Sequence, residues 1–129
     1  MPASTVIPVL AYPSVAEAVA WLSAAFGFTL RLGIGDHRAQ VNAGDGAIVI
    51  TAGAAPGAGG RDSIMIRVDD ARAHCERARG YGAAIVMEPT DFPYGERQYT
   101  AVDFSGRAWT FSESIADVDP RDWGGEVPR

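Results

Sequence analysis

Cysteine is almost missing from this sequence: Cys75 is the only one in 129 residues. A single cysteine excludes an internal disulfide framework and favours a reducing compartment, so we expect a cytoplasmic protein. Long apolar runs are missing as well, since no stretch approaches the roughly 20 residues that span a bilayer. The start of the chain lacks the basic residues and apolar core of a secretory signal. We therefore expect no contact with a membrane.

Basic charge is also in short supply. Eleven basic residues stand against sixteen acidic ones, which gives a net charge of -5, and the basic residues are scattered along the chain. Nucleic-acid binding draws on clustered Lys and Arg, so this balance argues against a nucleic-acid partner. A mildly acidic surface can favour a cationic ligand, but it also simply serves solubility.

The N-terminal third predicts a strand followed by an amphipathic helix. Thr5–Tyr12 is apolar and contains Pro8, which cannot donate to a sheet ladder, so we expect an edge strand. Ser14 and Glu17 form an S-x-x-E capping box, and Gly27 is typical of a helix C-terminus. Between them runs one apolar stripe with helical spacing: Val15, Ala18, Val19, Leu22, Ala25 and Phe26.

Three further strands complete a β-α-β-β-β unit, module one, at residues 5–52. They are expected at Phe28–Gly33, Arg38–Asn42 and Ala47–Thr51, with glycine-rich turns between them. The segment that follows, 53–62, is rich in Gly and Ala and cannot build a core, so it predicts a flexible linker.

The same pattern then restarts as module two, at residues 63–113, followed by a tail at 114–129. A strand at Ser63–Val68 leads into a helix that Asp69 or Asp70 can cap and that ends near Gly80–Gly82. Further strands are expected at Ala83–Met87, Gln98–Val102 and Arg107–Ser112, with a long turn at Glu88–Arg97 and a tight hairpin turn at Asp103–Gly106.

The two halves keep register. Gly27 and Gly82 are 55 residues apart, Leu10 and Ile66 are 56 apart, and Gly46 and Gly106 are 60 apart. A duplicated unit explains these offsets with small changes in loop length, whereas chance similarity of two αβ units is the alternative. We predict a single α+β domain over residues 1–129, in which two tandem βαβββ modules form a curved mixed sheet around a groove with the helices outside.

Three stretches of the sequence resemble the vicinal-oxygen-chelate superfamily of glyoxalases, bleomycin-resistance proteins and dioxygenases. They are VIPVLAYPSVAEAVAWLSAAFGF at 6–28, SIMIRVDDARAHCERARGYGAAIV at 63–86, and PYGERQYTAVDFSGRAWTFSE at 93–113. The last is similar to the PYG-x-R…D-x-x-G-x-x-W-x-F ending of the bacterial bleomycin-resistance-like subgroup, and the tail DVDPRDWGG at 117–125 also fits that subgroup.

In metal-dependent members of this superfamily, the first and last strands of each module supply His, Gln or Glu ligands. The resemblance places these positions at Ile7, Ile50, Ser63 and Thr110, and the repeat offsets of 56 and 60 agree with the placement. Isoleucine has no lone pair to offer, and neutral hydroxyls are poor ligands for a divalent ion that prefers imidazole, carboxylate or thiolate. We therefore predict no metal of the usual kind and no cofactor.

The resemblance implies a homodimer that binds a small molecule in a largely apolar groove. We expect a binding protein of the bleomycin-resistance type, which sequesters an antibiotic or another aromatic or cationic compound; the sequence does not name the ligand. The expected groove residues are Ile7, Val9, Ile48, Ile50, Ser63, Met65 and Thr110, with Tyr94, Arg97 and Tyr99 at the mouth.

A lyase, isomerase or dioxygenase with an unusual or metal-independent site is the alternative. Asp36 and His37 could form a hydrogen-bonded general base, although adjacent residues in a hairpin more often point apart into solvent. Glu96 is the third candidate. It lies within an aromatic and charged loop, 91–99, that either lines a pocket or merely closes one end of the groove.

Overall fold

The computed structural model describes residues 5–54 and 62–125, and it contains the β-α-β-β-β unit twice. The expected linker falls mostly on residues 55–61, which lie outside the described residues. Module one consists of β1 (Val9–Tyr12), α1 (Val15–Phe26), β2 (Thr29–Ile34), β3 (Arg38–Ala43) and β4 (Gly46–Ala52). Module two consists of β5 (Ile64–Arg67), α2 (Ala71–Gly80), β6 (Ala84–Phe92), β7 (Glu96–Val102) and β8 (Ala108–Ser114), followed by a short 3₁₀ helix, η1 (Pro120–Trp123).

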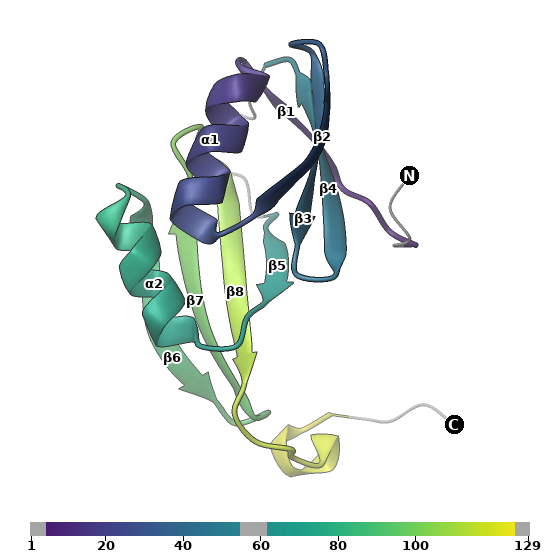
Figure 1. The fold of residues 1–129 in the computed structure, drawn as a ribbon. Coiled ribbons are helices and arrows are strands. Elements are labelled where there is room, and N and C mark those ends of the chain that lie inside the picture. Colours follow the sequence, from purple (N-terminus) through teal and green to yellow (C-terminus); the bar gives the residue numbers. More distant parts are fainter. Residues whose placement is uncertain (1–4, 55–61, 126–129) are drawn as a thin grey trace.

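Each module folds into its own four-stranded mixed sheet. Sheet A has the order β1-β4-β3-β2 and sheet B the order β5-β8-β7-β6, with a parallel pair at β1–β4 and at β5–β8 and antiparallel pairs elsewhere. Helix α1 packs on sheet A, and α2 packs on sheet B and also contacts α1 (Figure 1). The predicted tandem α+β architecture is confirmed. No helix in the described part of the chain is long and apolar enough to cross a membrane.

The ends of α1 follow the signals in the sequence. The side chain of Ser14 caps the helix by accepting a hydrogen bond from the backbone N–H of Glu17, and Gly27 ends it with a φ of 78°. The last turn of α1 has no basic residue of its own. Arg77 of α2 takes that role, because its guanidinium donates to the carbonyl oxygens of Ser23 and Ala24.

One hydrophobic core lies between the helices and the sheets, and it corrects three expected groove residues. Ile48 and Ile50 are 2% and 0% exposed and pack in this core, as does Tyr99 at 0%. On β4, Ile50 pairs with Leu10, which also belongs to the core. Alternate residues of a strand point to opposite faces, so Val49, between the two isoleucines, takes the opposite face.

The expected placement of Ile48 and Ile50 is wrong because the hairpins of the two modules differ in length by one residue. Four residues separate the paired Asn42 and Ala47 at the β3–β4 turn, whereas five separate the paired Val102 and Ala108 at the β7–β8 turn. The offset between the modules therefore changes from 60 to 61 across this turn. The residue equivalent to Thr110 is Val49 and not Ile50.

The expected long turn at Glu88–Arg97 is also wrong. Strand β6 runs on to Phe92 and β7 starts at Glu96, so only residues 93–95 turn the chain. Gly95 makes this possible with a φ of 84° and a hydrogen bond from its N–H to the carbonyl oxygen of Phe92. The acidic residues of this segment and Phe92 therefore lie on strands, whereas Tyr94 lies in the turn.

Candidate functional site

The face of sheet B that points away from α2 carries a row of polar side chains, which we call the polar face. Two antiparallel pairs between β7 and β8 set its direction, because Thr100 lies opposite Thr110, and Gln98 opposite Ser112. Trp109 and Phe111, which alternate with these residues on β8, point into the core. The polar face consists of Ser63, Met65 and Arg67 before and on β5, Glu96, Gln98 and Thr100 on β7, and Thr110 and Ser112 on β8.

Hydrogen bonds join most of these side chains. The Gln98 amide donates to the Ser112 hydroxyl at 3.1 Å, and Ser112 donates to the Glu96 carboxylate at 2.8 Å. The hydroxyls of Thr100 and Thr110 lie 3.0 Å apart. The central members are nearly buried, so their rotamers are fixed by packing and by one another. A face built in this way presents hydroxyl and amide groups in fixed positions for a polar ligand.

Glu96 is the acidic group of this face. Its carboxylate lies 3.9 Å from the guanidinium of Arg67, whose side chain is 74% exposed, while that of Glu96 is 20% exposed. Such an exposed pair adds little to stability. Arg67 is therefore able to turn toward a ligand, and Glu96 keeps its hydrogen bond from Ser112 when it does.

The corresponding face of sheet A combines apolar side chains, Val9 and Val49, with polar ones, Gln40 and Thr51. Val9 is 57% exposed and lies opposite Val49, which is buried and also lies opposite Gln40. Ile7 is half-buried, two residues before Val9 in the chain. Of the residues expected to line a groove, the structure therefore places Val9, Ser63, Met65 and Thr110 on the faces that the helices leave uncovered.

These residues fit a divalent metal poorly. With the corrected register, the four positions that the superfamily uses for ligands fall on Ile7, Val49, Ser63 and Thr110. The hydroxyl oxygens of Ser63 and Thr110 are 3.5 Å apart and share a hydrogen bond. Across residues 5–54 and 62–125, no three His, Cys, Asp or Glu side chains are grouped closely enough to hold an ion. Hydroxyls and aliphatic groups do not form a zinc, nickel or iron site.

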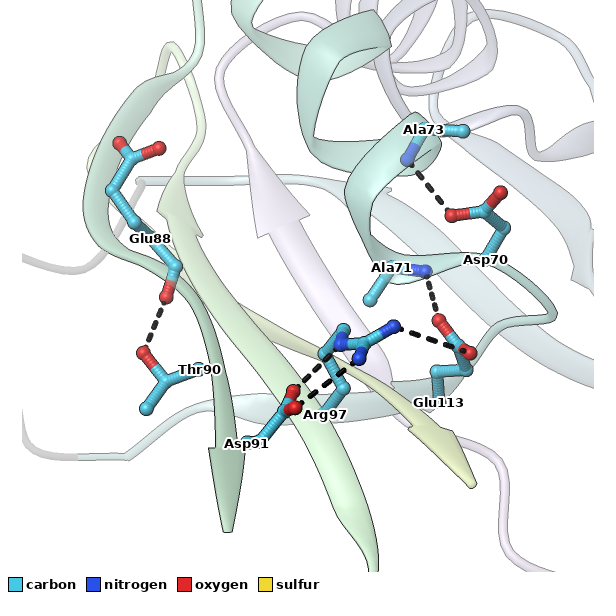
Figure 2. A network of polar contacts seen from close by, with 8 residues as sticks. All are labelled: Asp70, Ala71, Ala73, Glu88, Thr90, Asp91, Arg97 and Glu113. Atoms are coloured by element: carbon cyan, nitrogen blue, oxygen red, sulfur yellow. Dashed lines mark hydrogen bonds and ion pairs between the residues drawn. The ribbon is translucent and has the colours of Figure 1, made fainter. Parts of the chain in front are cut away.

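Arg97, expected at the mouth of the groove, lies on the other side of sheet B (Figure 2). Its guanidinium makes two bonds to Asp91, at 2.6 and 3.1 Å, and approaches the Glu113 carboxylate at 3.9 Å. The same Glu113 accepts a 2.8 Å hydrogen bond from the N–H of Ala71 at the start of α2. The hydrogen bonds from Arg97 to Asp91 lower the pKa of the Asp91 carboxyl group. The network fixes the N-terminus of α2 to the sheet, and its charges are satisfied without a ligand.

The two tyrosines expected at the mouth also have other partners. Tyr94 stacks on Phe92 and meets Trp123 of η1 edge-on, with ring centroids 5.3 Å apart in both cases. Trp123 thus docks the tail on the β6–β7 turn. Tyr99 is buried beneath α2, where its hydroxyl contacts Nδ1 of His74. Neither ring lies on the polar face.

Asp36 and His37 do not form a catalytic pair. Both are exposed in the turn between β2 and β3, and no hydrogen bond or ion pair joins their side chains in the described part of the chain. The carbonyl oxygen of His37 accepts hydrogen bonds from the Thr51 hydroxyl and the Ala52 N–H. This turn belongs to sheet A, whereas Glu96, the third catalytic candidate, belongs to sheet B.

Gln98, Thr100 and Ser112 are members of the polar face that the sequence reading missed. Their signal was present as an alternation with the apolar core positions Tyr99, Ala101 and Phe111. It could be used only with the strand register, because the sequence does not say which set faces the helices.

Comparisons with known proteins agree with this geometry. The model of the Glyoxalase/Bleomycin resistance protein/Dioxygenase superfamily matches residues 5–111. The crystal structure of TioX from Micromonospora sp. ML1 is 32% identical, covers 87% of this chain and 99% of its own, and superposes with a TM-score of 0.71. No curated protein sequence is similar enough to match.

Two more distant structures show the same fold. The fosfomycin resistance protein FosX from Listeria monocytogenes is 16% identical over 88% of this chain and 92% of its own, with a TM-score of 0.74. A glyoxalase/bleomycin resistance protein from Streptomyces sp. CB03234 is 23% identical over 85% of this chain and all of its own, 100%, with a TM-score of 0.69. This chain belongs to the glyoxalase/bleomycin resistance protein/dioxygenase superfamily.

Proposed function

We propose that this protein binds a small molecule on the polar face without a metal, and that it sequesters an antibiotic or another aromatic or cationic compound. The hydrogen-bonded row from Gln98 through Ser112 to Glu96 carries the proposal. It supplies donors, acceptors and one carboxylate in fixed positions, which suits a polar or cationic organic ligand. The resistance proteins among the structural neighbours support a ligand of the antibiotic type.

We further infer a cytoplasmic homodimer. Strands β1 and β5 lie at the edges of their sheets, and the exposed Val9 and Met65 lie on them. Open strand edges with apolar neighbours favour pairing with another chain. A second copy placed there would also give the polar face an opposite wall, which a ligand needs for tight binding. Sedimentation of the purified protein tests this, and a monomer at micromolar concentration contradicts it.

The binding test is a thermal-shift panel combined with metal analysis. Bleomycin-like glycopeptides, fosfomycin and planar aromatic cations are added to the native protein, and a ligand that binds raises Tm. Thr110→Val removes the hydroxyl that Ser63 and Thr100 contact, so it should reduce the shift. Thr29→Val, on the exposed strand β2, is the matched control and should leave it unchanged. Stoichiometric zinc, nickel or iron, or no shift with any compound, contradicts the proposal.

A lyase, isomerase or dioxygenase is the second candidate, and one observation favours it. The Glu96 carboxylate is held by Ser112 and remains partly open to solvent, as a general base requires. Turnover of a bound compound that Glu96→Gln abolishes, with binding retained, would support an enzyme. Binding without turnover supports sequestration.

A further inference from the structure

A hollow of about 390 Å³ opens between α1 and β2, on the side of sheet A that faces the helix. Its walls are apolar, with Val15 and Val19 from α1 facing Leu30 from β2. Gly33 lies opposite the buried Ala39, so a side chain at position 33 would point to the helix side of the sheet, into this hollow. The hollow lies on the other side of sheet A from Val9 and Val49, and so it is separate from the polar face.

Module two has larger side chains at the positions that surround this hollow in module one. Caps Ser14 and Asp70 are 56 residues apart, so Ala20 and Ser23 on α1 correspond to Glu76 and Arg79 on α2. In module two, Arg79 contacts Glu76 and also Glu88 on β6, and thereby bridges the helix and the outer strand. Module one has only small side chains at the helix positions.

The sheet positions follow the same rule. Leu32 pairs with Gln40 as Met87 pairs with Thr100, so Gly33 corresponds to Glu88.

The floor of the hollow differs by a whole aromatic ring. Ala39 pairs with Ile50 as Tyr99 pairs with Phe111, and Ala39 is therefore the equivalent of Tyr99. In module two, the Tyr99 ring stacks on Phe111 beneath α2 and is completely buried. Module one keeps the helix and the sheet but lacks this ring and the bridging side chains.

The rim of the hollow carries one charge of each sign. Asp36 and Arg38 line it, and neither side chain has a hydrogen bond or an ion pair with any other residue that the structure describes. A ligand with a charged substituent can therefore pair with one of them without displacing an existing partner.

We propose that this hollow is a second ligand site, which takes a compound with a single aromatic ring and a polar or charged substituent. The ring occupies the space that Tyr99 fills in module two, and the substituent lies at the rim beside Asp36 and Arg38. The volume falls in the range of roughly 300–1,000 Å³ that small-molecule sites occupy. The proposal is independent of ligand binding at the polar face.

The test is a titration of isotope-labelled protein, followed by amide NMR. The probes are phenol, phenylacetate and phenethylamine, with cyclohexanol as the non-aromatic match for phenol. We expect saturable shifts at amides 15–20 and 30–39 with all three aromatic probes and weaker shifts with cyclohexanol. Arg38→Gln should weaken binding of phenylacetate, and Asp36→Asn that of phenethylamine, with phenol unaffected.

Filling the hollow should remove the site. A Cβ at Gly33 meets no atom within 4 Å, so Gly33→Leu can enter the hollow without a clash and should weaken binding by about tenfold or more. Gly80→Leu is the matched control, since a Cβ there also meets nothing within 4 Å. Ala20→Leu, at an exposed helix position, narrows the opening and serves if Gly33→Leu does not fold.

Three results would overturn the second site. They are shifts confined to the polar face, unchanged binding in both filled variants, and no saturable shift with any aromatic probe. Arg67→Gln, which changes an exposed side chain of the polar face, should leave ring binding intact. Binding in the hollow by a protein whose polar face binds nothing would contradict the proposed function and leave the second site standing.

Discussion

The hydroxyl of Tyr12 on β1 donates a 2.7 Å hydrogen bond to Oδ2 of Asp103 in the β7–β8 turn, and both residues are buried. This bond joins the first strand of module one to the last hairpin of module two. Asp103 also accepts hydrogen bonds from the Trp109 indole and from the backbone N–H groups of Ser105 and Arg107. Burial, followed by the charge of Asp103, raises the pKa of Tyr12, which therefore stays a neutral donor.

Asp103→Asn should lower the free energy of unfolding by about 2–4 kcal/mol, because a buried carboxylate with four donors is replaced by a group that also brings two donors of its own. Tyr12→Phe removes one bond and should cost about 1–2 kcal/mol. Urea unfolding followed by circular dichroism measures both. Asp45→Asn, in the exposed β3–β4 turn, is the control. An Asp103→Asn variant as stable as the wild type would show that this carboxylate does not hold the modules together.

Stability should fall as the pH drops below about 6.5, because of His74. Its Nε2 lies 2.9 Å from the carbonyl oxygen of Phe26 and its Nδ1 contacts the Tyr99 hydroxyl, so the neutral ring satisfies both partners. Burial lowers the pKa of His74 in the folded state. The unfolded chain then binds more protons in this window, so the free energy of unfolding is greatest above pH 6.5 and declines on acidification.

His74→Gln should remove most of this slope between pH 7 and about pH 5. The exposed His37 is the matched control, and His37→Gln should leave the slope as it is. Urea midpoints at several pH values are the measurement. If His37→Gln removes the slope and His74→Gln keeps it, the pH dependence of stability does not come from His74.

Local signals in the sequence were sufficient for the elements and their repetition. Ser14 and Gly27 mark both ends of α1 because capping depends only on neighbours in the chain. The facing of the strands was harder to obtain. Ile48, Val49 and Ile50 are all apolar, so their composition does not say which of them faces the helix, and the answer depends on one residue in the β3–β4 hairpin.

The charged residues show a second limit. Arg97 was expected to bind a ligand because of its aromatic and acidic neighbours in the sequence. Its actual partners are Asp91 across the β6–β7 pair and Glu113 from β8. The strand pairing decides which carboxylates contact an arginine. Because the sequence predicts a turn over residues 88–97, it does not predict the pairing of Asp91 with Arg97.

Cys75 should be protected from thiol reagents in the native protein. Its side chain is completely buried in the core, and burial raises the pKa of its thiol, so little reactive thiolate is present. Reaction with Ellman's reagent should require unfolding, and its rate should follow the unfolding rate. Val86→Cys, at a position that is 61% exposed, should add one thiol that reacts at once. Rapid reaction of the single thiol in the wild type would contradict the packing of α2.

Gly95 and Gly106 form a natural pair for testing how the tail is held. Both have a positive φ, 84° and 88°, so alanine strains the backbone at either position. A Cβ at Gly95 would lie 2.1 Å from the carbonyl oxygen of Ala116, whereas a Cβ at Gly106 meets nothing within 4 Å. The Gly95 carbonyl also accepts hydrogen bonds from the N–H groups of Ile115 and Ala116. Only Gly95→Ala therefore displaces the tail.

Gly106→Ala should cost about 1 kcal/mol from backbone strain alone. Gly95→Ala should cost more in urea unfolding, and it should also release the tail for cleavage by trypsin at Arg121, while Gly106→Ala keeps the tail protected. The Trp123 fluorescence should change only in Gly95→Ala, because its ring rests edge-on against Tyr94. Equal protection of Arg121 in both variants would mean that the contacts at Gly95 do not hold the tail.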